Sequence, residues 1–292
     1  MRRAALIYNP KSGRQRHAAI LDAVIARLAA GGFAVEAVPT AFRGQATELA
    51  RERAAAGYEA VFSFGGDGTA REVAAGLLGT GVPLGMLPGG TANVLPRALG
   101  LPREPLAAAE AMRHCRAVPF DVGLAGDVPF LMMASVGLDA QVLARLDERL
   151  KWRFGPAAIA WQGCREWWRY AYPEVAVVTG EGERLAGTFA AVVNIPYYAG
   201  AFRLAPEARP DDGLFDLVVF SGRGRATTLA FAACLLRARH LTRRDVVVRR
   251  LREAVVEAPS ELCVQVDGDV CPAGFPLTVQ RSTRKLIVLA RP

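Results

Sequence analysis

Residues 60–69 read Ala60-Val61-Phe62-Ser63-Phe64-Gly65-Gly66-Asp67-Gly68-Thr69, an apolar run that passes directly into a glycine-rich loop. The apolar run predicts a buried β-strand, and the residues from Thr69 onward predict a helix. Three glycines within four residues weaken regular structure unless the backbone must bend sharply or a ligand must come close. This stretch therefore predicts a phosphate-binding loop at the end of a strand in a parallel sheet.

Two further loops of similar composition also follow apolar segments. Asn9-Pro10-Lys11-Ser12-Gly13 comes after the predicted strand Ala4–Tyr8, and Pro88-Gly89-Gly90-Thr91-Ala92-Asn93 comes after Pro83–Leu87. Because the carboxyl ends of parallel strands meet at one edge of a sheet, we expect the three loops to surround one polyanion, a nucleoside triphosphate. The first loop alone is also typical of an ordinary turn. The sequence contains no GxxxxGK[ST] stretch, which excludes a Walker-type loop.

The order of predicted elements divides the chain into two parts. Up to about residue 115, strands and helices alternate, which is typical of a parallel sheet covered on both faces. From about Phe120, short strands follow one another between Gly, Pro and Asp turns, and helices are expected at Ala140–Leu150, Pro156–Tyr170 and Arg225–His240. This pattern favours an antiparallel β-sandwich. We therefore expect an α/β, Rossmann-like nucleotide-binding domain over residues 1–120 and a β-rich lipid or substrate domain over 121–282.

The composition is that of a globular protein with a basic surface. The chain has 292 residues, 52% of them hydrophobic, and a formal net charge of +8. Its basic residues are almost all arginines, which indicates a compositional bias of the source genome more than a nucleic-acid partner; attraction to anionic lipid or phosphate is the alternative. Five cysteines without CxxC spacing do not support a zinc site or a disulfide framework.

Targeting signals are not evident in the sequence. The apolar segment near the N-terminus turns polar at Asn9, which is too short for a signal peptide, and no run of 18 uncharged apolar residues occurs. We expect a cytoplasmic protein without a transmembrane segment that makes peripheral contact with a membrane.

The three loops, in this order and at about this spacing, resemble those of the diacylglycerol kinase catalytic-domain family, whose relatives include bacterial lipid kinases and the sphingosine and ceramide kinases. Later segments resemble landmarks of the same family, so the likeness runs through nearly the whole chain. These are Gly137-Leu138-Asp139, Tyr197-Tyr198-Ala199-Gly200 with Phe202–Pro206, Asp212–Asp216, and Asp267-Gly268-Asp269. The resemblance also implies that the last strand, about residues 283–292, returns to the first domain.

The resemblance implies roles for particular residues of this chain. Residues around ATP would be Asn9, Pro10, Lys11, Ser12, Gly13, Thr40, Gly65, Gly66, Asp67, Gly68, Thr69, Thr91 and Asn93. Asp269 would be the general base that accepts a proton from the acceptor hydroxyl, with Mg²⁺ offsetting charge on the phosphoryl group. Asp67 and Asp267 would assist with metal or hydroxyl placement. Since Asp67 would repel a triphosphate, its partner is expected to be a metal, a hydroxyl or N–H groups of the loop itself.

A second metal site is implied at residues 209–214. In the family, a structural Mg²⁺ is held by one carboxylate and two backbone carbonyls, which here correspond to Asp212 and the carbonyls of Arg209 and Leu214. Hard oxygen ligands of this kind suit magnesium. A plain Asp-Gly turn without a metal is the alternative interpretation.

This sequence departs from the family pattern at two positions. The tail element usually has Glu where this chain has Asp269, which shortens the side chain by one C–C bond, about 1.5 Å. Arg71 stands where family members often have Asn. Both departures concern the expected chemistry, and they leave a catalytically inactive, nucleotide-binding regulator as one alternative function.

The aromatic cluster of the second part also has two interpretations. Trp161, Trp167 and Trp168 lie near Arg165 and Arg169, a mixture found at membrane interfaces and lipid entrances. We favour a buried aromatic seam, because aromatic side chains mostly pack in cores. The helix Arg225–His240 is likewise expected to pack against the core, with lining of a lipid pocket as the alternative.

The expected function is that of an ATP- and Mg²⁺-dependent lipid kinase. Its acceptor would be a hydroxyl of a diacylglycerol-like or sphingoid lipid at a membrane surface, with no nucleic acid as a partner. A kinase of a soluble acceptor, similar to NAD kinase, is the nearest enzymatic alternative. A homodimer is compatible with the sequence, which does not fix the oligomeric state.

Overall fold

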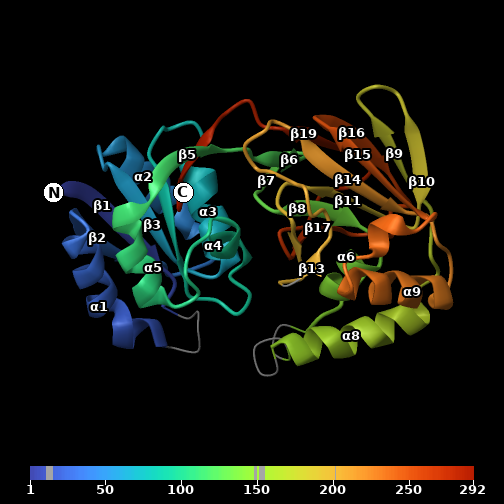
Figure 1. Cartoon of the computed structure of the whole chain (residues 1–292), viewed down its shortest axis with the longest axis horizontal. Coiled ribbons are helices and arrows are strands. Elements are labelled where there is room, and N and C mark those ends of the chain that lie inside the picture. Colours follow the sequence, from blue (N-terminus) through green and yellow to red (C-terminus); the bar gives the residue numbers. More distant parts are fainter. Residues whose placement is uncertain (11–15, 148–149, 151–154, 201) are drawn as a thin grey trace. The chain divides into compact units, whose positions relative to one another are not determined.

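The computed structural model describes residues 1–10, 16–147, 150, 155–200 and 202–292 (Figure 1). Within this part of the chain, the residues form two compact units, Met1–Val122 with Thr283–Pro292 and Gly123–Ser282. Among the helices of the described residues, none is both long enough and apolar enough to cross a membrane.

The first unit is an α/β domain built around one six-stranded sheet. Its helices are α1 (Arg16–Ala30), α2 (Gln45–Ala55), α3 (Asp67–Leu77), α4 (Val94–Ala98), α5 (Pro105–Ala111) and the 3₁₀ turn η2 (Met112–His114). Its strands are β1 (Arg2–Tyr8), β2 (Phe33–Pro39), β3 (Ala60–Gly65), β4 (Leu84–Pro88), β5 (Arg116–Phe120) and β20 (Leu286–Ala290).

The strand order of this sheet is β2-β1-β3-β4-β20-β5. β1 to β4 and β20 pair in parallel, and β5 joins β20 in antiparallel orientation. Every residue of β3 and β4 is buried, as expected for strands with helices on both faces. The chain reverses its direction of travel across the sheet between β1 and β3, and ligands of open α/β sheets bind at the carboxyl ends of the strands beside such a point.

The second unit is an antiparallel β-sandwich, which together with the parallel first unit confirms the fold class expected from the sequence. One sheet has the order β10-β9-β16-β19-β6-β7 and the other β15-β14-β11-β8-β17-β18. The strands of the first sheet, in chain order, are β6 (Gly123–Ala125), β7 (Val128–Phe130), β9 (Val175–Thr179), β10 (Arg184–Gly187), β16 (Glu253–Glu257) and β19 (Leu277–Arg281). Those of the second are β8 (Met133–Val136), β11 (Phe189–Val193), β14 (Phe215–Phe220), β15 (Val246–Leu251), β17 (Val264–Val266) and β18 (Asp269–Cys271).

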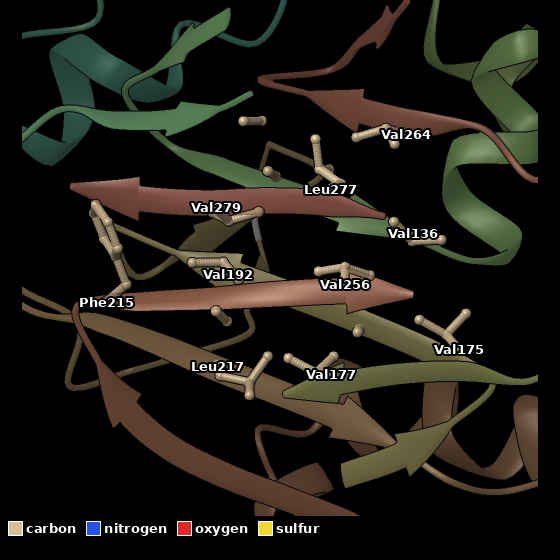
Figure 2. Packing of buried hydrophobic residues seen from close by; sticks show 14 of the residues in the cluster. Val136, Val175, Val177, Val192, Phe215, Leu217, Val256, Val264, Leu277 and Val279 are labelled. Atoms are coloured by element: carbon tan, nitrogen blue, oxygen red, sulfur yellow. The ribbon is translucent and has the colours of Figure 1, made fainter. Parts of the chain in front are cut away.

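The remaining elements of this unit are helices and one short hairpin: α6 (Leu138–Ala144), α8 (Pro156–Arg169), α9 (Arg225–Leu236), η3 (His240–Thr242), β12 (Tyr197–Tyr198) and β13 (Phe202–Arg203). Valine side chains from both sheets meet in the core of the sandwich, with Val177, Val192, Val256 and Val279 close together in Figure 2. Phe130 and Phe215 add a ring contact, with centroids 5.4 Å apart.

Four boundaries expected from the sequence were wrong. The residue pattern predicts a helix over Thr91–Leu99, but the helix begins only at Val94, because Asn93 has a left-handed backbone (φ 48°). It also predicts one strand over Val118–Leu124, which is broken into β5 and β6 in different units. A single strand predicted over Val128–Ser135 divides into β7 and β8, which belong to different sheets. The helix expected over 140–150 is described as α6, which ends at Ala144.

The glycine at the start of β6 provides a test of core packing. A Cβ on Gly123 would lie 2.0 Å from Cζ of Phe130, so Gly123→Ala must displace a buried ring and should lower stability by about 1–3 kcal/mol. Gly163→Ala is the matched control, since in α8 the added Cβ meets no described atom within 4 Å and should raise stability by about 0.5–1 kcal/mol. The midpoint of urea denaturation measures both; equal midpoints for the two variants would contradict this packing.

Candidate active site

The loops predicted to bind phosphate follow the carboxyl ends of β1, β3 and β4, beside the point where the sheet reverses direction. The Asn9 N–H donates to the Phe64 carbonyl (3.2 Å), which joins the end of β1 to the end of β3. The Thr40 N–H, after β2, donates to the Tyr8 carbonyl (2.9 Å). The described residues Asn9, Pro10 and Thr40 therefore lie at one edge of the sheet. Lys11, Ser12 and Gly13 lie outside the described residues.

Glycine allows the loops after β3 and β4 to touch. The Gly89 N–H donates to the Gly65 carbonyl (2.7 Å), and a Cβ on Gly90 would lie only 2.5 Å from Cα of Gly66. A Cβ on Gly65 would lie 2.6 Å from Oγ1 of Thr69. Since backbone atoms and a packed side chain occupy these positions, the fold itself requires Gly65 and Gly90.

Gly68 differs from these glycines. It is exposed in the first turn of α3, its φ is not in the left-handed region, and an added Cβ would meet no described atom within 4 Å. Neither packing nor backbone strain among the described residues therefore explains a glycine at this position. A surface glycine beside the N–H groups of a helix start gives an anion close access to the backbone.

Asp67 holds the two loops together through its carboxylate. Oδ1 accepts a hydrogen bond from the Leu95 N–H (2.9 Å) and Oδ2 accepts one from the Val94 N–H (3.0 Å). These donors are the first N–H groups of α4, which lack partners within that helix. Burial raises the pKa of the Asp67 carboxyl, and the two N–H donors act in the opposite direction. Of the three kinds of partner expected for Asp67, the structure supplies backbone N–H groups, from the loop after β4.

Asn93 completes the loop after β4. Its Oδ1 accepts from the Gly90 N–H and its Nδ2 donates to the Gly90 carbonyl, both at 2.8 Å. The left-handed backbone at Asn93 is one that Asn tolerates better than most residues. Its side chain thus shapes the loop, whereas Thr91 is exposed at the loop surface.

The Asp267-Gly268 pair forms the tight turn between β17 and β18. Both residues have positive φ (51° and 85°), as a two-residue type I′ hairpin requires. The Asp267 carboxylate is buried and accepts from the N–H groups of Leu131 (2.8 Å), Met132 (2.8 Å) and Met133 (3.0 Å). These are the residues at which β7 gives way to β8. Asp267 therefore fixes the backbone, and the half-buried Asp269 follows as the first residue of β18.

A chain of hydrogen bonds runs from Asp139 to this turn. The Ser135 hydroxyl donates to Asp139 Oδ2 (2.5 Å), Gln265 Nε2 donates to Ser135 Oγ (2.8 Å), and the Gly268 N–H donates to Gln265 Oε1 (2.8 Å). Tyr198 also donates to Asp139. The sequence analysis did not identify Gln265 and Ser135. Each is a polar residue within an otherwise apolar strand, and that pattern could have indicated a buried hydrogen bond.

Asp212 lies in a surface turn with an acidic surplus. Its Oδ1 accepts from the Leu214 N–H (3.0 Å), and its other oxygen accepts from the Arg250 guanidinium. Burial raises the pKa of nearby Asp216, Arg250 opposes this, and the charges of Asp212 and Glu207 raise it further. The Arg250 guanidinium thus acts on both Asp212 and Asp216, and that of Arg281 lies beside Gly213 in the same turn. No group of three or more His, Cys, Asp or Glu side chains suited to a metal occurs in the described part of the chain, so a metal at Asp212 would need backbone carbonyl ligands.

The buried carboxyl of Asp139 gives a pH-dependent prediction. Burial raises its pKa, so the folded state holds this proton more tightly than the unfolded state does. Its contribution to stability is therefore present at low pH and is lost as the pH rises through the raised value. Asp139→Asn should remove this contribution, so wild type should lose stability relative to the variant as the pH rises above about 4, the ordinary pKa of an aspartate.

Urea midpoints measured across that range test the prediction. The exposed Asp127→Asn is the control for loss of one negative charge. Parallel pH profiles for wild type and Asp139→Asn would contradict the prediction.

Comparisons with known proteins agree for both units. The diacylglycerol kinase catalytic domain family matches residues 3–125, and the YegS C-terminal NAD kinase beta sandwich-like domain family matches residues 132–290. A diacylglycerol kinase from Bacillus subtilis (strain 168) is 30% identical over 274 residues, which cover 92% of this chain and 90% of the relative. A Pseudomonas putida protein named probable lipid kinase YegS-like is 36% identical over 224 residues, covering 75% and 74% of the two chains.

Solved structures show the same fold. A crystal structure from Bacillus anthracis str. Sterne covers 99% of this chain and 95% of its own, with a TM-score of 0.84 at 24% identity. Another from the same organism, titled a diacylglycerol kinase, has a TM-score of 0.74 at 21% identity and covers 99% and 97% of the two chains. With both sequence families in chain order and a relative aligned over nine-tenths of its length, the chain belongs to the family of diacylglycerol kinases and related lipid kinases.

Proposed function

We propose that this protein transfers the γ-phosphate of ATP, with Mg²⁺, to a hydroxyl of a diacylglycerol-like or sphingoid lipid. The observation that carries the proposal is the pair of glycine loops after β3 and β4, which the Asp67 carboxylate joins at the edge of a parallel sheet. Backbone N–H groups in such a position suit a polyphosphate. Among the residues proposed from the sequence to surround ATP, Gly65–Thr69, Thr91 and Asn93 belong to these two loops.

The role of proton acceptor fits Asp269 better than the other two candidates. Both oxygens of Asp67 and both oxygens of Asp267 already accept backbone N–H groups, so protonation would weaken contacts that hold loops in place. Asp269 is half-buried, at the end of a turn that Gln265 and Ser135 support. A general base works best when its geometry is fixed by surrounding contacts of this kind.

In the proposed reaction, the lipid hydroxyl oxygen forms a bond to the γ-phosphorus as the bond from that phosphorus to the bridging oxygen breaks. The hydroxyl proton passes to the Asp269 carboxylate, and ADP carries away the electrons of the broken bond. Mg²⁺ bound with the nucleotide would offset charge on the phosphoryl oxygens. The backbone N–H groups of Gly66 and Gly68, at the start of α3, would hold the phosphates, because those of Gly89 and Gly90 already donate to Gly65 and Asn93.

A structural Mg²⁺ is also proposed at Asp212 with the carbonyls of Arg209 and Leu214. The neighbouring carboxyl groups of Asp212, Asp216 and Glu207 are compatible with a divalent cation. Arg250 now holds one oxygen of Asp212, and a metal would compete with it. Such an ion would stabilise the 209–214 turn without taking part in phosphoryl transfer.

One observation favours a second candidate acceptor. The family that matches residues 132–290 is described by its likeness to the β-sandwich of NAD kinase, which keeps a soluble acceptor open. The lipid acceptor is preferred because relatives named as diacylglycerol and lipid kinases align with both units. Contact of the protein with a membrane surface is part of the proposal.

Gly68 tests the nucleotide role separately from folding. Gly68→Ala should leave stability unchanged or slightly raised, since the added Cβ meets no described atom, but should weaken ATP binding by about tenfold or more. Gly90→Ala is the contrasting variant, because its Cβ would collide with Gly66 and should lower stability itself. Calorimetric titration with ATP and Mg²⁺, alongside thermal melting, measures both effects. Unchanged ATP affinity in a folded Gly68→Ala protein would argue against phosphate binding at this loop.

Asp269 tests the chemistry. Asp269→Asn should lower the turnover rate by about 10²- to 10⁴-fold, the usual contribution of a general base, while ATP affinity stays near that of wild type. Asp269→Glu, which restores the longer side chain usual in the family, should retain measurable transfer. The assay follows ³²P from γ-labelled ATP into diacylglycerol, monoacylglycerol, sphingosine, ceramide and phosphatidylglycerol, with NAD as the soluble acceptor.

The outcomes of this assay separate the candidates. Lipid labelling that persists in Asp269→Asn would remove Asp269 from the base role. Labelling of NAD instead of lipid would replace the proposed acceptor with a soluble one. ATP binding without transfer to any acceptor would indicate a nucleotide-binding regulator and contradict the proposed activity.

A further inference from the structure

Helix α8 exposes two tryptophans to solvent and buries the polar side chains of Gln162 and Glu166 against the protein. Ala158, Gln162 and Glu166 are buried at intervals of four residues, which places them on one face. On the other side, Trp161 is 68% exposed and Trp168 is 60% exposed. A helix that packs on a soluble domain normally has the opposite arrangement. The buried aromatic seam expected from the sequence is therefore wrong for Trp161 and Trp168.

Polar contacts fix this orientation of α8. The Glu166 carboxylate is only 2% exposed, and it accepts from Arg145 Nη1 (2.7 Å) on one oxygen and from Gln162 Nε2 (3.0 Å) on the other. Rotating α8 to bury its tryptophans would separate a buried carboxylate from its guanidinium partner, which is strongly unfavourable. Exposure of the tryptophans is thus a consequence of specific contacts beneath them.

Helix α9 adds a second exposed apolar stripe. Leu229 is 57% exposed and Leu236 is 64% exposed, and the exposed Ala232 lies between them at helical spacing. On the opposite side Leu235 is buried, and the Phe231 ring stacks on Phe220 with centroids 4.5 Å apart. Helix α9 thus packs against the core on one face and exposes apolar side chains on the other.

The two helices are joined at one end. Arg225 donates from Nη2 (2.7 Å) and Nε (3.1 Å) to the Trp168 carbonyl, and its guanidinium lies 4.1 Å from the centroid of the Trp168 ring. Trp167 Nε1 donates to the Arg225 carbonyl (3.1 Å). These contacts bring the end of α8 to the start of α9, and Figure 1 shows both helices in this unit. We call the exposed residues of the two joined helices the α8–α9 surface.

The charges on this surface are of one sign. Exposed arginines accompany the apolar side chains on both helices and at the end of α9: Arg165, Arg169, Arg225, Arg237 and Arg239. Residues 155–172 contain a single acidic residue, the buried Glu166, and residues 225–239 contain none. A surface that enters the headgroup region of an anionic membrane is typically rich in tryptophan, leucine and arginine and poor in carboxylates.

We propose that the α8–α9 surface docks on an anionic phospholipid bilayer. Trp161, Trp168, Leu229 and Leu236 enter the boundary between headgroups and acyl chains, and the arginines around them pair with lipid phosphates. A second copy of the chain is a poorer occupant, because two arginine-rich surfaces without carboxylates repel each other. The inference rests on the proposed function only in that a lipid kinase must reach its acceptor in a membrane.

Cosedimentation of the full chain with vesicles tests the docking surface. Vesicles of phosphatidylglycerol and phosphatidylcholine should bind wild type, and vesicles of phosphatidylcholine alone should bind it much less. Trp161→Gln combined with Leu236→Gln should weaken binding by about tenfold or more, since interfacial affinity follows buried apolar area. Arg165→Gln combined with Arg239→Gln should weaken binding and reduce its dependence on salt.

Phe42→Gln is the matched control. Phe42 is an exposed aromatic residue of the first unit, outside the α8–α9 surface, and its replacement should leave vesicle binding unchanged. Circular dichroism and thermal melting of each variant would establish that it is folded. Vesicle binding that is absent in wild type, or equal in wild type and both double variants, would overturn the proposal. Self-association that only the surface variants abolish, without vesicle binding, would instead assign the surface to a second copy.

A short-chain diacylglycerol dispersed without vesicles separates this proposal from the proposed function. Its phosphorylation should be unaffected by the surface variants, because no bilayer is involved. Phosphorylation of that substrate by a wild-type protein that does not bind vesicles would overturn the docking surface alone. Vesicle binding that the surface variants abolish, without labelling of any lipid, would support the docking surface and contradict the kinase.

Discussion

The Asp67 carboxylate joins the loop after β3 to the start of α4, where its partners Val94 and Leu95 lie 27 and 28 residues further along the chain. The candidate nucleotide site depends on this contact. Its two oxygens hold the first N–H groups of α4, while Gly66 and Gly90 bring the loop backbones together. Larger side chains at Gly66 and Gly90 would keep the two loop backbones apart. The remaining glycine, Gly68, is left exposed at the helix start, where an anion can reach the backbone.

The second unit contains a similar contact between an aspartate and backbone N–H groups. Asp267 binds three consecutive N–H groups at the junction of β7 and β8, as Asp67 binds two at the start of α4. In the Asp67-Gly68 and Asp267-Gly268 elements, the aspartate shapes the backbone. In the proposed function, the chemistry belongs to neighbouring groups, namely the N–H groups around Gly68 and the carboxylate of Asp269. The hydrogen-bond chain through Gln265, Ser135 and Asp139 supports the turn that precedes Asp269.

The fold class could be predicted from sequence because strand and helix periodicities are local. The common position of the loops after β1, β3 and β4 could also be predicted, since loops after parallel strands share one side of a sheet; nucleotide binding there stays a prediction. The partners of Asp67 and Asp267 could not be predicted, because they lie on segments distant in the chain. The orientation of α8 could not be predicted for a similar reason. The buried Glu166 pairs with Arg145, which lies outside α8, and this contact turns Trp161 and Trp168 toward solvent.

The most direct test of this account is backbone amide hydrogen exchange in the presence and absence of ATP with Mg²⁺. The account predicts slower exchange on nucleotide addition in residues 65–69 and 88–95, the two loops that Asp67 joins, with no change in α8 and α9. Unchanged exchange in both loops at saturating ATP, or protection confined to the second unit, would contradict nucleotide binding at this edge of the sheet.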